Sequence, residues 1–150
     1  MFDRVLILCA GNICRSPMAE GLLRQAVQTA GQGPQVNSAG LTAMSGEPAD
    51  PMAVQLLAER GIDIGAHRSV QATEEMLRGY PLVLVMERAQ QDYLEDIWPA
   101  FHGRVFRWGH WQDFEVPDPY TRGEQAFRDA LAMIERGLPD WQQRLEMRRV

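Results

Sequence analysis

Only 2 of the 150 residues are cysteines, Cys9 and Cys14, and they form neither a disulfide framework nor a Cys/His set with zinc spacing. The chain also lacks a long hydrophobic run, since the apolar segment 5–8 is far too short for a membrane span or a signal peptide. Basic residues form no run except Arg148-Arg149, and the net charge is −5, which excludes a broad nucleic-acid surface. We therefore expect a cytoplasmic protein with no membrane span and no nucleic-acid partner. We expect its two thiols to take part in chemistry rather than to stabilise the structure.

Internal repeats and low-complexity segments are absent too, and the 45% hydrophobic content suits one compact domain over residues 1–150. Strand-like apolar segments and helix-like segments alternate along the chain. This alternation predicts an α/β fold with a parallel sheet covered on both faces, and ligands at the carboxyl ends of the strands. The expected strands are 4–8, 34–40, 80–86 and 104–108, and the expected helices are 17–30, 51–60, one starting at 73, 88–97 and one from 123 onward.

Two prolines predict local features of helices. Ser16-Pro17 is typical of a helix start, with Ser16 as N-cap and Pro17 at the first helical position. In the last helix, Pro139 should cause a kink or a division because proline cannot supply the helical amide. An apolar stripe at steps of four and three predicts that helix: Phe127, Leu131, Ile134, Leu138, Trp141 and Leu145.

The segment 9–15 joins the first strand to the first helix and carries a thiol and a guanidinium. Unpaired amides at a helix start attract anions, and Gly11 and Asn12 tolerate the left-handed angles that let a loop curl around one anion. The planar guanidinium of Arg15 can bind two phosphoryl oxygens. The positive electrostatic potential at the helix start also favours the nucleophilic thiolate of Cys9. Because the loop has no GxxxxGK[ST] pattern, it predicts a phosphate site with a nucleophile rather than a nucleotide site. The alternative is a pair of buried, inert cysteines in a turn.

With its flanks, Cys9-x5-Arg15-Ser16-Pro17 resembles the near-N-terminal signature of the low-molecular-weight protein tyrosine phosphatases. The resemblance covers nearly the whole chain and is greatest to the bacterial branch, on the segments Ser38-Ala39-Gly40 and His67-Arg68-Ser69. It implies a single three-layer α/β domain with a four-stranded parallel sheet in the flavodoxin-like order 2-1-3-4.

A second motif, Asp118-Pro119-Tyr120, is similar to the family's second signature, although an ordinary Asp-Pro turn would also fit these residues. The resemblance implies that Cys9 is the nucleophile, Arg15 binds phosphate and Asp118 is the general acid and base. It also implies a reaction that passes through a phosphocysteine and needs no metal and no cofactor. Asp113 and Glu115 lie on the same loop and are alternative acids, but they lack the Pro-Tyr context.

The resemblance also implies supporting residues. Asn12 should be braced by Ser38 and His67, and Cys14 should be able to form a reversible disulfide with Cys9 that protects it from over-oxidation. Ser16 should donate a hydrogen bond to the Cys9 sulfur. The residues expected to bind phosphate or substrate are Ala10, Gly11, Asn12, Ile13, Cys14, Ser16, Met44 and Tyr120.

Other residues near these motifs have two interpretations. Trp108 and Trp111 could either wall the pocket or pack in the core or at its rim, whereas His102 and His110 are most simply surface or loop residues. The segment Ser69-Val70-Gln71 departs from the family, whose members often carry a second basic residue before the Gln.

Three other functions fit parts of the pattern. Arsenate reductases of this type need further cysteines, which are absent here. Protein-arginine phosphatases of the family carry Thr at the place of Ile13, whose apolar side chain suits a phenyl ring better than a guanidinium. A non-catalytic phosphotyrosine-binding module would not need Cys9, Arg15 and Asp118 together.

Phosphotyrosine is therefore the expected substrate group. Bacterial relatives commonly act opposite a tyrosine autokinase that controls exopolysaccharide or capsule export, so the resemblance implies such a kinase as partner, and Met44 could tune that choice. We expect a monomer or a weak dimer.

Overall fold

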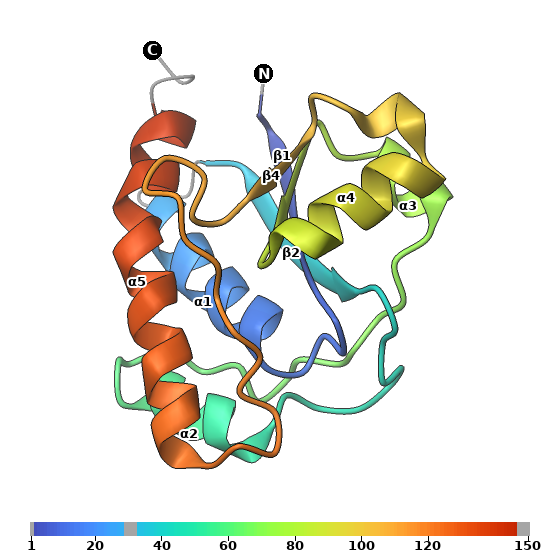
Figure 1. Ribbon diagram of the computed structural model, residues 1–150. Coiled ribbons are helices and arrows are strands. Elements are labelled where there is room, and N and C mark those ends of the chain that lie inside the picture. Colours follow the sequence, from blue (N-terminus) through green and yellow to red (C-terminus); the bar gives the residue numbers. More distant parts are fainter. Residues whose placement is uncertain (1, 29–32, 147–150) are drawn as a thin grey trace.

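The computed structural model describes residues 2–28 and 33–146. Its four strands form one parallel sheet in the order β2-β1-β3-β4, with helices on both faces (Figure 1). The expected three-layer α/β fold and strand order are confirmed. The elements are β1 (Arg4–Cys9), α1 (Arg15–Val27), β2 (Gln35–Gly40), α2 (Pro51–Ala58), α3 (Glu74–Arg78), β3 (Leu82–Val85), α4 (Arg88–Ile97), η2 (Pro99–Phe101), β4 (Val105–Arg107) and α5 (Glu124–Glu146).

The sheet separates the core into two layers, and the inner strand β1 contributes side chains to both. Val5, Ile7 and Cys9 pack into one cluster with side chains of α1, α2 and α5. Leu6 and Leu8 pack into a second cluster with side chains of α3 and α4. Because successive side chains of a strand point to opposite faces, the continuous apolar run of β1 fits a strand that is buried on both. The last residue of β1, Cys9, therefore lies at the carboxyl edge of the sheet, paired in register with Gly40.

The start of α1 differs from the expectation that Ser16 is the N-cap, which was wrong. Cys14 occupies the N-cap position without a side-chain capping bond, and α1 begins at Arg15. The Ser16 hydroxyl is used in the preceding loop, where its oxygen lies 3.0 Å from Cys9 Sγ and accepts a 2.8 Å hydrogen bond from Asn12 Nδ2. The expected helical residues 29–30 lie outside the described residues.

The last helix, α5, runs from Glu124 to Glu146 with Pro139 inside it, so the expected division does not occur. Pro139 is exposed, and water can therefore satisfy the carbonyl one turn earlier that loses its helical partner. Buried side chains on both sides of the proline, among them Ile134 and Trp141, pack both parts of α5 against the core.

Short capping interactions explain several other boundaries. Asp50 accepts from Met52 N at 2.9 Å at the start of α2, and Thr73 accepts from Met76 N at 3.1 Å at the start of α3. The strand expected at 80–86 is shorter, because Tyr80 N bonds to the Leu77 carbonyl and still belongs to the turn after α3. Across residues 2–28 and 33–146, no helix is both long and apolar enough to cross a membrane.

Candidate active site

The loop between β1 and α1 is folded around the Cys9 sulfur. The Asn12 amide donates to Cys9 Sγ at 3.3 Å, and the Ser16 hydroxyl lies 3.0 Å from the same sulfur. Asn12 has φ 60, the left-handed conformation that asparagine tolerates better than most residues. The Asn12 amide stabilises negative charge on the sulfur, and the Ser16 hydroxyl does so when it is the donor.

A close approach of β2 fixes the other side of this loop. A Cβ on Gly40 would lie 2.7 Å from the Ala10 carbonyl oxygen and 3.0 Å from Asn12 Cβ. Backbone bonds from Leu41 N to Cys9 O and from Thr42 N to Ala10 O continue the pairing into the loop. Gly40 is therefore needed for the loop to reach the sheet edge.

The Asn12 side chain is fully buried and holds three separate segments together. Its Nδ2 donates to Ser16 Oγ at 2.8 Å and to Ser38 Oγ at 3.0 Å, and its Oδ1 accepts from Val70 N at 2.9 Å. The amide therefore connects α1, β2 and the segment before α3 to the loop between β1 and α1.

The Asn12 carbonyl is held as well. His67 Nε2 lies 2.7 Å from it, and the Ser69 hydroxyl donates to it at 2.9 Å. On the far side, Glu20 Oε1 accepts from Ser38 Oγ at 2.6 Å and lies 3.8 Å from His67 Nδ1. The structure thus brings the three predicted supporting residues, Asn12, Ser38 and His67, into one network with two residues that the sequence did not single out.

Arg15 lies at the first position of α1, and its side chain is only 2% exposed. Its Nη1 donates to the Val116 carbonyl at 2.8 Å and lies 3.1 Å from Glu87 Oε1. Its Nη2 lies 3.7 Å from Asp118 Oδ2. Among the described residues, Arg15 Nε has no hydrogen-bond partner, although it is buried. A buried donor of this kind is suited to bind an anion.

Asp118 reaches the loop from the segment between β4 and α5. Its Oδ1 accepts from Tyr120 N at 3.1 Å, and its carboxyl is 45% exposed. The backbone ahead of it is anchored by the bond from Val116 N to the Met86 carbonyl. Asp118 can therefore exchange protons with water while it stays beside Arg15.

The residues on both sides of the thiol enclose one small cavity of about 170 Å³. Met44 and Tyr120, each 40% exposed, form part of its rim, while Ile13 is nearly buried in its wall. Its lining residues are Cys9, Ala10, Gly11, Ile13, Cys14, Arg15, Thr42, Met44, Asp118 and Tyr120. Of the predicted site residues, Asn12, Ser16, Ser38 and His67 lie behind this lining, where they support the loop.

Cys14 is a buried, free thiol, as Cys9 is. Burial raises the pKa of the Cys14 thiol well above its ordinary value of 9.0, and the negative charge of Asp50 raises it further. Cys14 therefore stays protonated at neutral pH and is a poor nucleophile.

The two alternative acids point elsewhere. Asp113 accepts from Arg107 Nη2 at 2.8 Å, and this hydrogen bond lowers the pKa of Asp113 below its ordinary value. Glu115 accepts from Arg88 N at 2.6 Å. Both carboxylates are engaged outside the cavity, which leaves Asp118 as the acid that lines it.

The tryptophans and histidines also lie away from this cavity. Trp108 is buried in the core, and Trp111 is 49% exposed on another part of the surface. His102 and His110 are exposed, in agreement with their expected surface positions. Within the described part of the chain, no group of three or more His, Cys, Asp or Glu residues could hold a metal ion.

Sequence reasoning did not single out Glu87, Glu20 and Ser69. Glu87 follows β3 at the same carboxyl edge as Cys9, and that position could have marked it as a residue of the site. Ser69 was noted only as part of a segment that resembles the family, and Glu20 is a common residue type within a helix. Only the folded chain brings Ser69 to the Asn12 carbonyl and Glu20 to Ser38 and His67.

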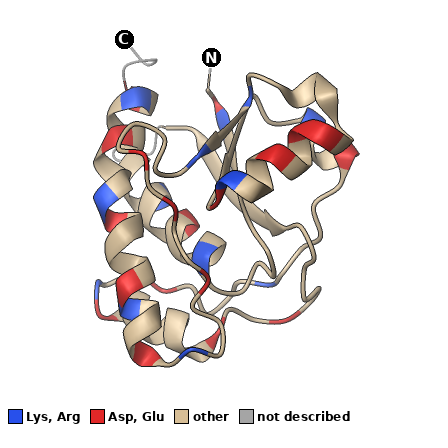
Figure 2. Cartoon of the chain, viewed as in Figure 1, with Lys and Arg blue, Asp and Glu red and all other residues tan. Residues whose placement is uncertain are grey.

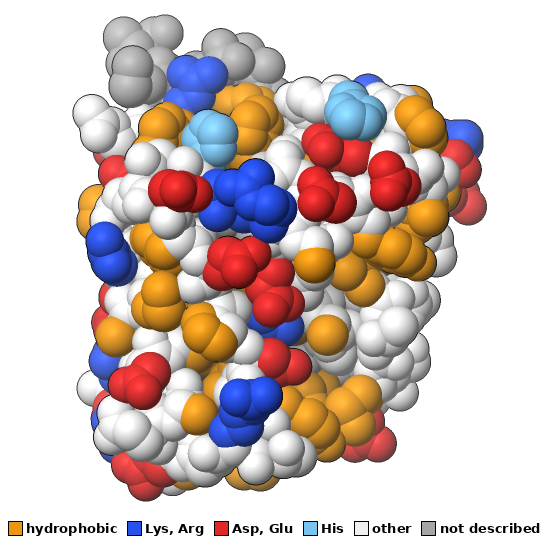
Figure 3. Space-filling model, in the orientation of Figure 1, with side chains coloured by type: hydrophobic (Ala, Val, Ile, Leu, Met, Phe, Trp, Pro, Cys, Tyr) orange, Lys and Arg blue, Asp and Glu red, His pale blue; other side chains and the backbone are white. Residues whose placement is uncertain are grey.

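Charge on the remaining surface is mixed. Acidic and basic residues are interspersed along α5 (Figure 2), and the face shown in Figure 3 has no broad basic area. The loop and the buried Arg15 are therefore a local candidate anion site rather than part of a broad basic area on this face.

Comparisons with known proteins agree with this geometry. The family described as low molecular weight phosphotyrosine protein phosphatase matches residues 4–150. The chain is 47% identical over 145 residues to the probable low molecular weight protein-tyrosine-phosphatase EpsP of Ralstonia solanacearum, with 97% of each chain covered.

Two solved structures share the fold closely. Vibrio vulnificus Wzb in complex with benzylphosphonate aligns with a TM-score of 0.90 and 33% identity, covering 97% of this chain and 100% of that one. YwlE arginine phosphatase from Geobacillus stearothermophilus aligns with a TM-score of 0.89 and 29% identity, covering 99% and 95%. The chain thus belongs to the low molecular weight phosphotyrosine protein phosphatase family and is a cysteine-dependent tyrosine phosphatase.

Proposed function

We propose that this phosphatase hydrolyses phosphotyrosine with Cys9 as nucleophile, Arg15 as phosphate-binding residue and Asp118 as general acid and base. The observation that carries the proposal is the convergence of these three side chains on one cavity of about 170 Å³. The buried Arg15 Nε, which has no hydrogen-bond partner among the described residues, supports an anion there.

In the first step the Cys9 thiolate attacks phosphorus, and the bond from phosphorus to the tyrosyl oxygen breaks. Asp118 gives its proton to that oxygen, so tyrosine leaves neutral and a phosphocysteine remains. In the second step Asp118, now a carboxylate, takes a proton from water as the water oxygen attacks phosphorus. Inorganic phosphate leaves, and the Cys9 thiolate and protonated Asp118 are regenerated.

In both steps negative charge is spread over the three equatorial oxygens of the phosphoryl group in the transition state. The same hydrogen-bond donors can therefore stabilise both transition states. The loop amides and the Arg15 guanidinium supply these donors without needing to move far, because Asn12 and its partners hold the loop. The Ser16 hydroxyl can donate to Cys9 Sγ and stabilise the thiolate as it leaves phosphorus. This chemistry requires neither a metal nor a cofactor.

Phosphotyrosine is favoured over phosphoarginine by the cavity wall. Ile13 is only 7% exposed and presents an apolar side chain beside Cys9 and Met44. An apolar wall stabilises a phenyl ring but leaves a guanidinium without acceptors. Arginine dephosphorylation, named for the YwlE relative, is therefore the second candidate activity.

The proposed protein substrate is a tyrosine autokinase of exopolysaccharide or capsule export, as the family resemblance implies. The rim of the cavity is suited to a peptide, since Met44 and Tyr120 are exposed hydrophobic side chains that line it. We place this reaction in the cytoplasm, where reducing conditions keep Cys9 as a free thiol.

The test compares hydrolysis of p-nitrophenyl phosphate and phenyl phosphate by the wild type, Cys9→Ser and Asp118→Asn near pH 6. Cys9→Ser should abolish turnover, and Asp118→Asn should lower it by about 10² or more. The loss in Asp118→Asn should be greater for phenyl phosphate, whose poorer leaving group needs the proton more. Asp113→Asn is the matched control and should retain activity.

Two outcomes would contradict the proposal. Turnover by Cys9→Ser would show that Cys9 is not the nucleophile. Equal losses of activity in Asp118→Asn on both substrates would show that Asp118 is not the general acid. Phosphoarginine and phosphotyrosine peptides, including autokinase tail peptides, are measured with the wild type. A preference for phosphoarginine would favour the second candidate, and binding without turnover would favour a phosphotyrosine-binding module.

A further inference from the structure

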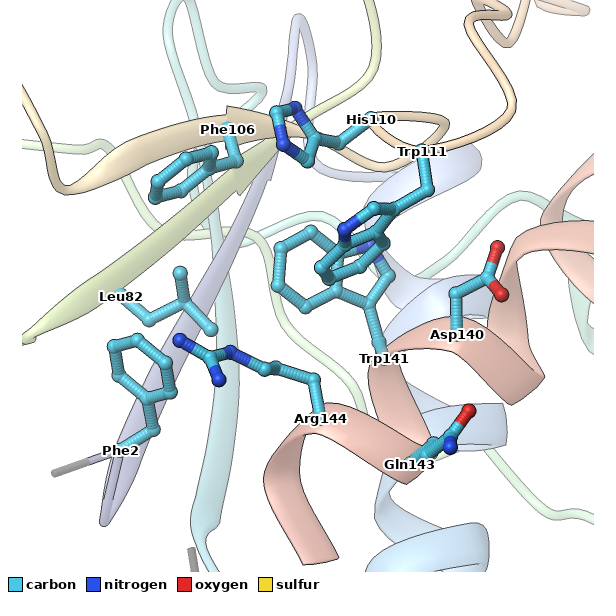
Figure 4. Close-up of a pocket in the computed structure, with 9 residues that line it drawn as sticks. All are labelled: Phe2, Leu82, Phe106, His110, Trp111, Asp140, Trp141, Gln143 and Arg144. Carbon is cyan, nitrogen blue, oxygen red and sulfur yellow. The ribbon is translucent and has the colours of Figure 1, made fainter. Parts of the chain in front are cut away.

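A second and larger cavity, of about 540 Å³, lies between the sheet and the last turns of α5 (Figure 4). Its lining includes Phe2, two residues before β1, and Leu82, the first residue of β3. Cys9 is at the opposite end of β1, and seven extended residues correspond to about 23 Å. The cavity is therefore separate from the active site, and its volume lies in the range of small-molecule sites.

Four aromatic rings form one continuous wall of this cavity. Phe106 contacts His110 with ring centroids 5.1 Å apart, and His110 contacts Trp111 at 5.1 Å. Trp111 contacts Trp141 at 4.5 Å, and Trp141 contacts Phe106 at 6.2 Å, which closes the cycle. A wall of this kind offers ring faces and edges on which a planar ligand can stack.

The wall is held in place by the core behind it. Trp141 is 2% exposed, and its Nε1 donates to the Trp108 carbonyl at 2.8 Å. Trp108 Nε1 in turn donates to the Ile134 carbonyl at 2.8 Å. Trp111 is 49% exposed, so it presents much of its indole to a ligand. Because the inner rings are fixed, little conformational entropy would be lost on binding.

One cation faces this aromatic wall. Arg144 lies on α5 one turn after Trp141, and its guanidinium extends across the cavity toward the Phe2 ring, 5.6 Å away (Figure 4). It has no carboxylate partner among the described residues. Asp140, four residues earlier on the same helix, accepts instead from Gln112 Nε2 at 2.8 Å.

We propose that this cavity is a second binding site, for a planar aromatic ligand that carries one anionic group. The ring stacks on Trp111, and the anionic group pairs with the Arg144 guanidinium. The apolar wall excludes a small hydrated ion as the ligand, and the positive charge of the Arg144 guanidinium favours an aromatic anion over a neutral aromatic molecule.

The test uses two fluorescent naphthalenes that differ in the anionic group. 8-Anilinonaphthalene-1-sulfonate carries a sulfonate, and N-phenyl-1-naphthylamine has the same rings without it. The wild-type chain of 150 residues should bind the sulfonate about tenfold more tightly than the neutral compound, as expected for one charge-assisted contact. Arg144→Gln should remove this difference, and Trp111→Ala should weaken both compounds.

Matched control variants distinguish binding in this cavity from nonspecific binding to any exposed arginine or aromatic ring. Arg78→Gln removes an exposed arginine from α3, and Tyr93→Ala removes an exposed ring from α4, and neither should alter binding. Retained aryl phosphate hydrolysis shows that each variant is folded. Equal affinity for the two naphthalenes, unchanged binding by Arg144→Gln, or displacement of the sulfonate by saturating inorganic phosphate would overturn the proposal.

Discussion

Glu87 Oε1 lies 3.1 Å from Arg15 Nη1, so the buried guanidinium of the proposed phosphate site is paired with a carboxylate from another strand end. Asp118 Oδ2 lies 3.7 Å from the other terminal nitrogen. Two carboxylates therefore share the cation that is proposed to bind the phosphate. Their charges oppose an incoming anion while their contacts orient the guanidinium.

Glu87→Gln tests which of these effects is larger. The amide keeps an acceptor beside Arg15 and removes one negative charge next to the proposed anion site, which should tighten anion binding by roughly threefold. The inhibition constant of inorganic phosphate in aryl phosphate hydrolysis should fall by that factor. Glu74→Gln, which removes an exposed carboxylate from α3, should leave it unchanged. Weaker inhibition would show that Glu87 acts chiefly by positioning Arg15.

Asn12 should be among the most sensitive positions for stability. Asn12→Ala removes three buried side-chain hydrogen bonds and leaves Val70 N unpaired, a loss of about 3 kcal/mol in the free energy of unfolding. Alanine also disfavours φ 60. Asn12→Gly loses the same bonds without that strain, so it should be about 1 kcal/mol more stable than Asn12→Ala. Urea unfolding measures both, and equal losses would contradict a role for the backbone conformation.

Ser16→Ala should slow the breakdown of the phosphocysteine. The hydroxyl lies 3.0 Å from Cys9 Sγ, and in the proposed mechanism it donates to the departing thiolate; such a bond is worth about 1.5–3 kcal/mol. Stopped-flow measurement with p-nitrophenyl phosphate should then show a burst followed by slower steady turnover. Ser38→Ala, which removes a hydroxyl that contacts Asn12 rather than the sulfur, should show a smaller change and no burst.

The reactive loop was predictable because its chemistry is contiguous in the sequence. Cys9, the left-handed Asn12 and Arg15 lie within seven positions between an apolar strand and a helix, and local rules connect that pattern to an anion. The strand order and the Asp118 motif came from resemblance to a family. Asp118 could not be chosen over Asp113 by composition alone, and the ion pair of Asp113 with Arg107 supplies the physical distinction.

The misassigned features have tertiary causes. Ser16-Pro17 fits a helix cap locally, but the Cys9 sulfur and the Asn12 amide compete for the Ser16 hydroxyl. Pro139 would end an isolated helix, whereas buried residues on both sides keep α5 continuous. Glu87 and Glu20 were missed because a carboxylate becomes part of a site only when the fold brings it to a partner.

Cys14 should make the protein less stable at alkaline pH. Its pKa is raised by burial in the folded state, so above the ordinary value of 9.0 the unfolded chain loses this proton while the folded chain keeps it. The unfolded state then binds fewer protons, and the free energy of unfolding falls as pH rises, by up to about 1.4 kcal/mol per pH unit. Urea unfolding between pH 8 and 10 should show a shallower fall for Cys14→Ala than for the wild type. Parallel curves would contradict the raised pKa.

Ile13→Thr should shift the substrate preference. Threonine keeps the branched shape at Cβ and replaces apolar surface with a hydroxyl that can accept a hydrogen bond from a guanidinium. The lost apolar contact with a phenyl ring corresponds to about 1 kcal/mol, or about fivefold in kcat/KM for a phosphotyrosine peptide. The ratio of phosphoarginine to phosphotyrosine turnover should therefore rise. Ile13→Val removes one methylene without adding a polar group, so it should lower kcat/KM slightly and leave the ratio unchanged. If Ile13→Thr lowered both activities equally, Ile13 would support the loop without selecting the leaving group.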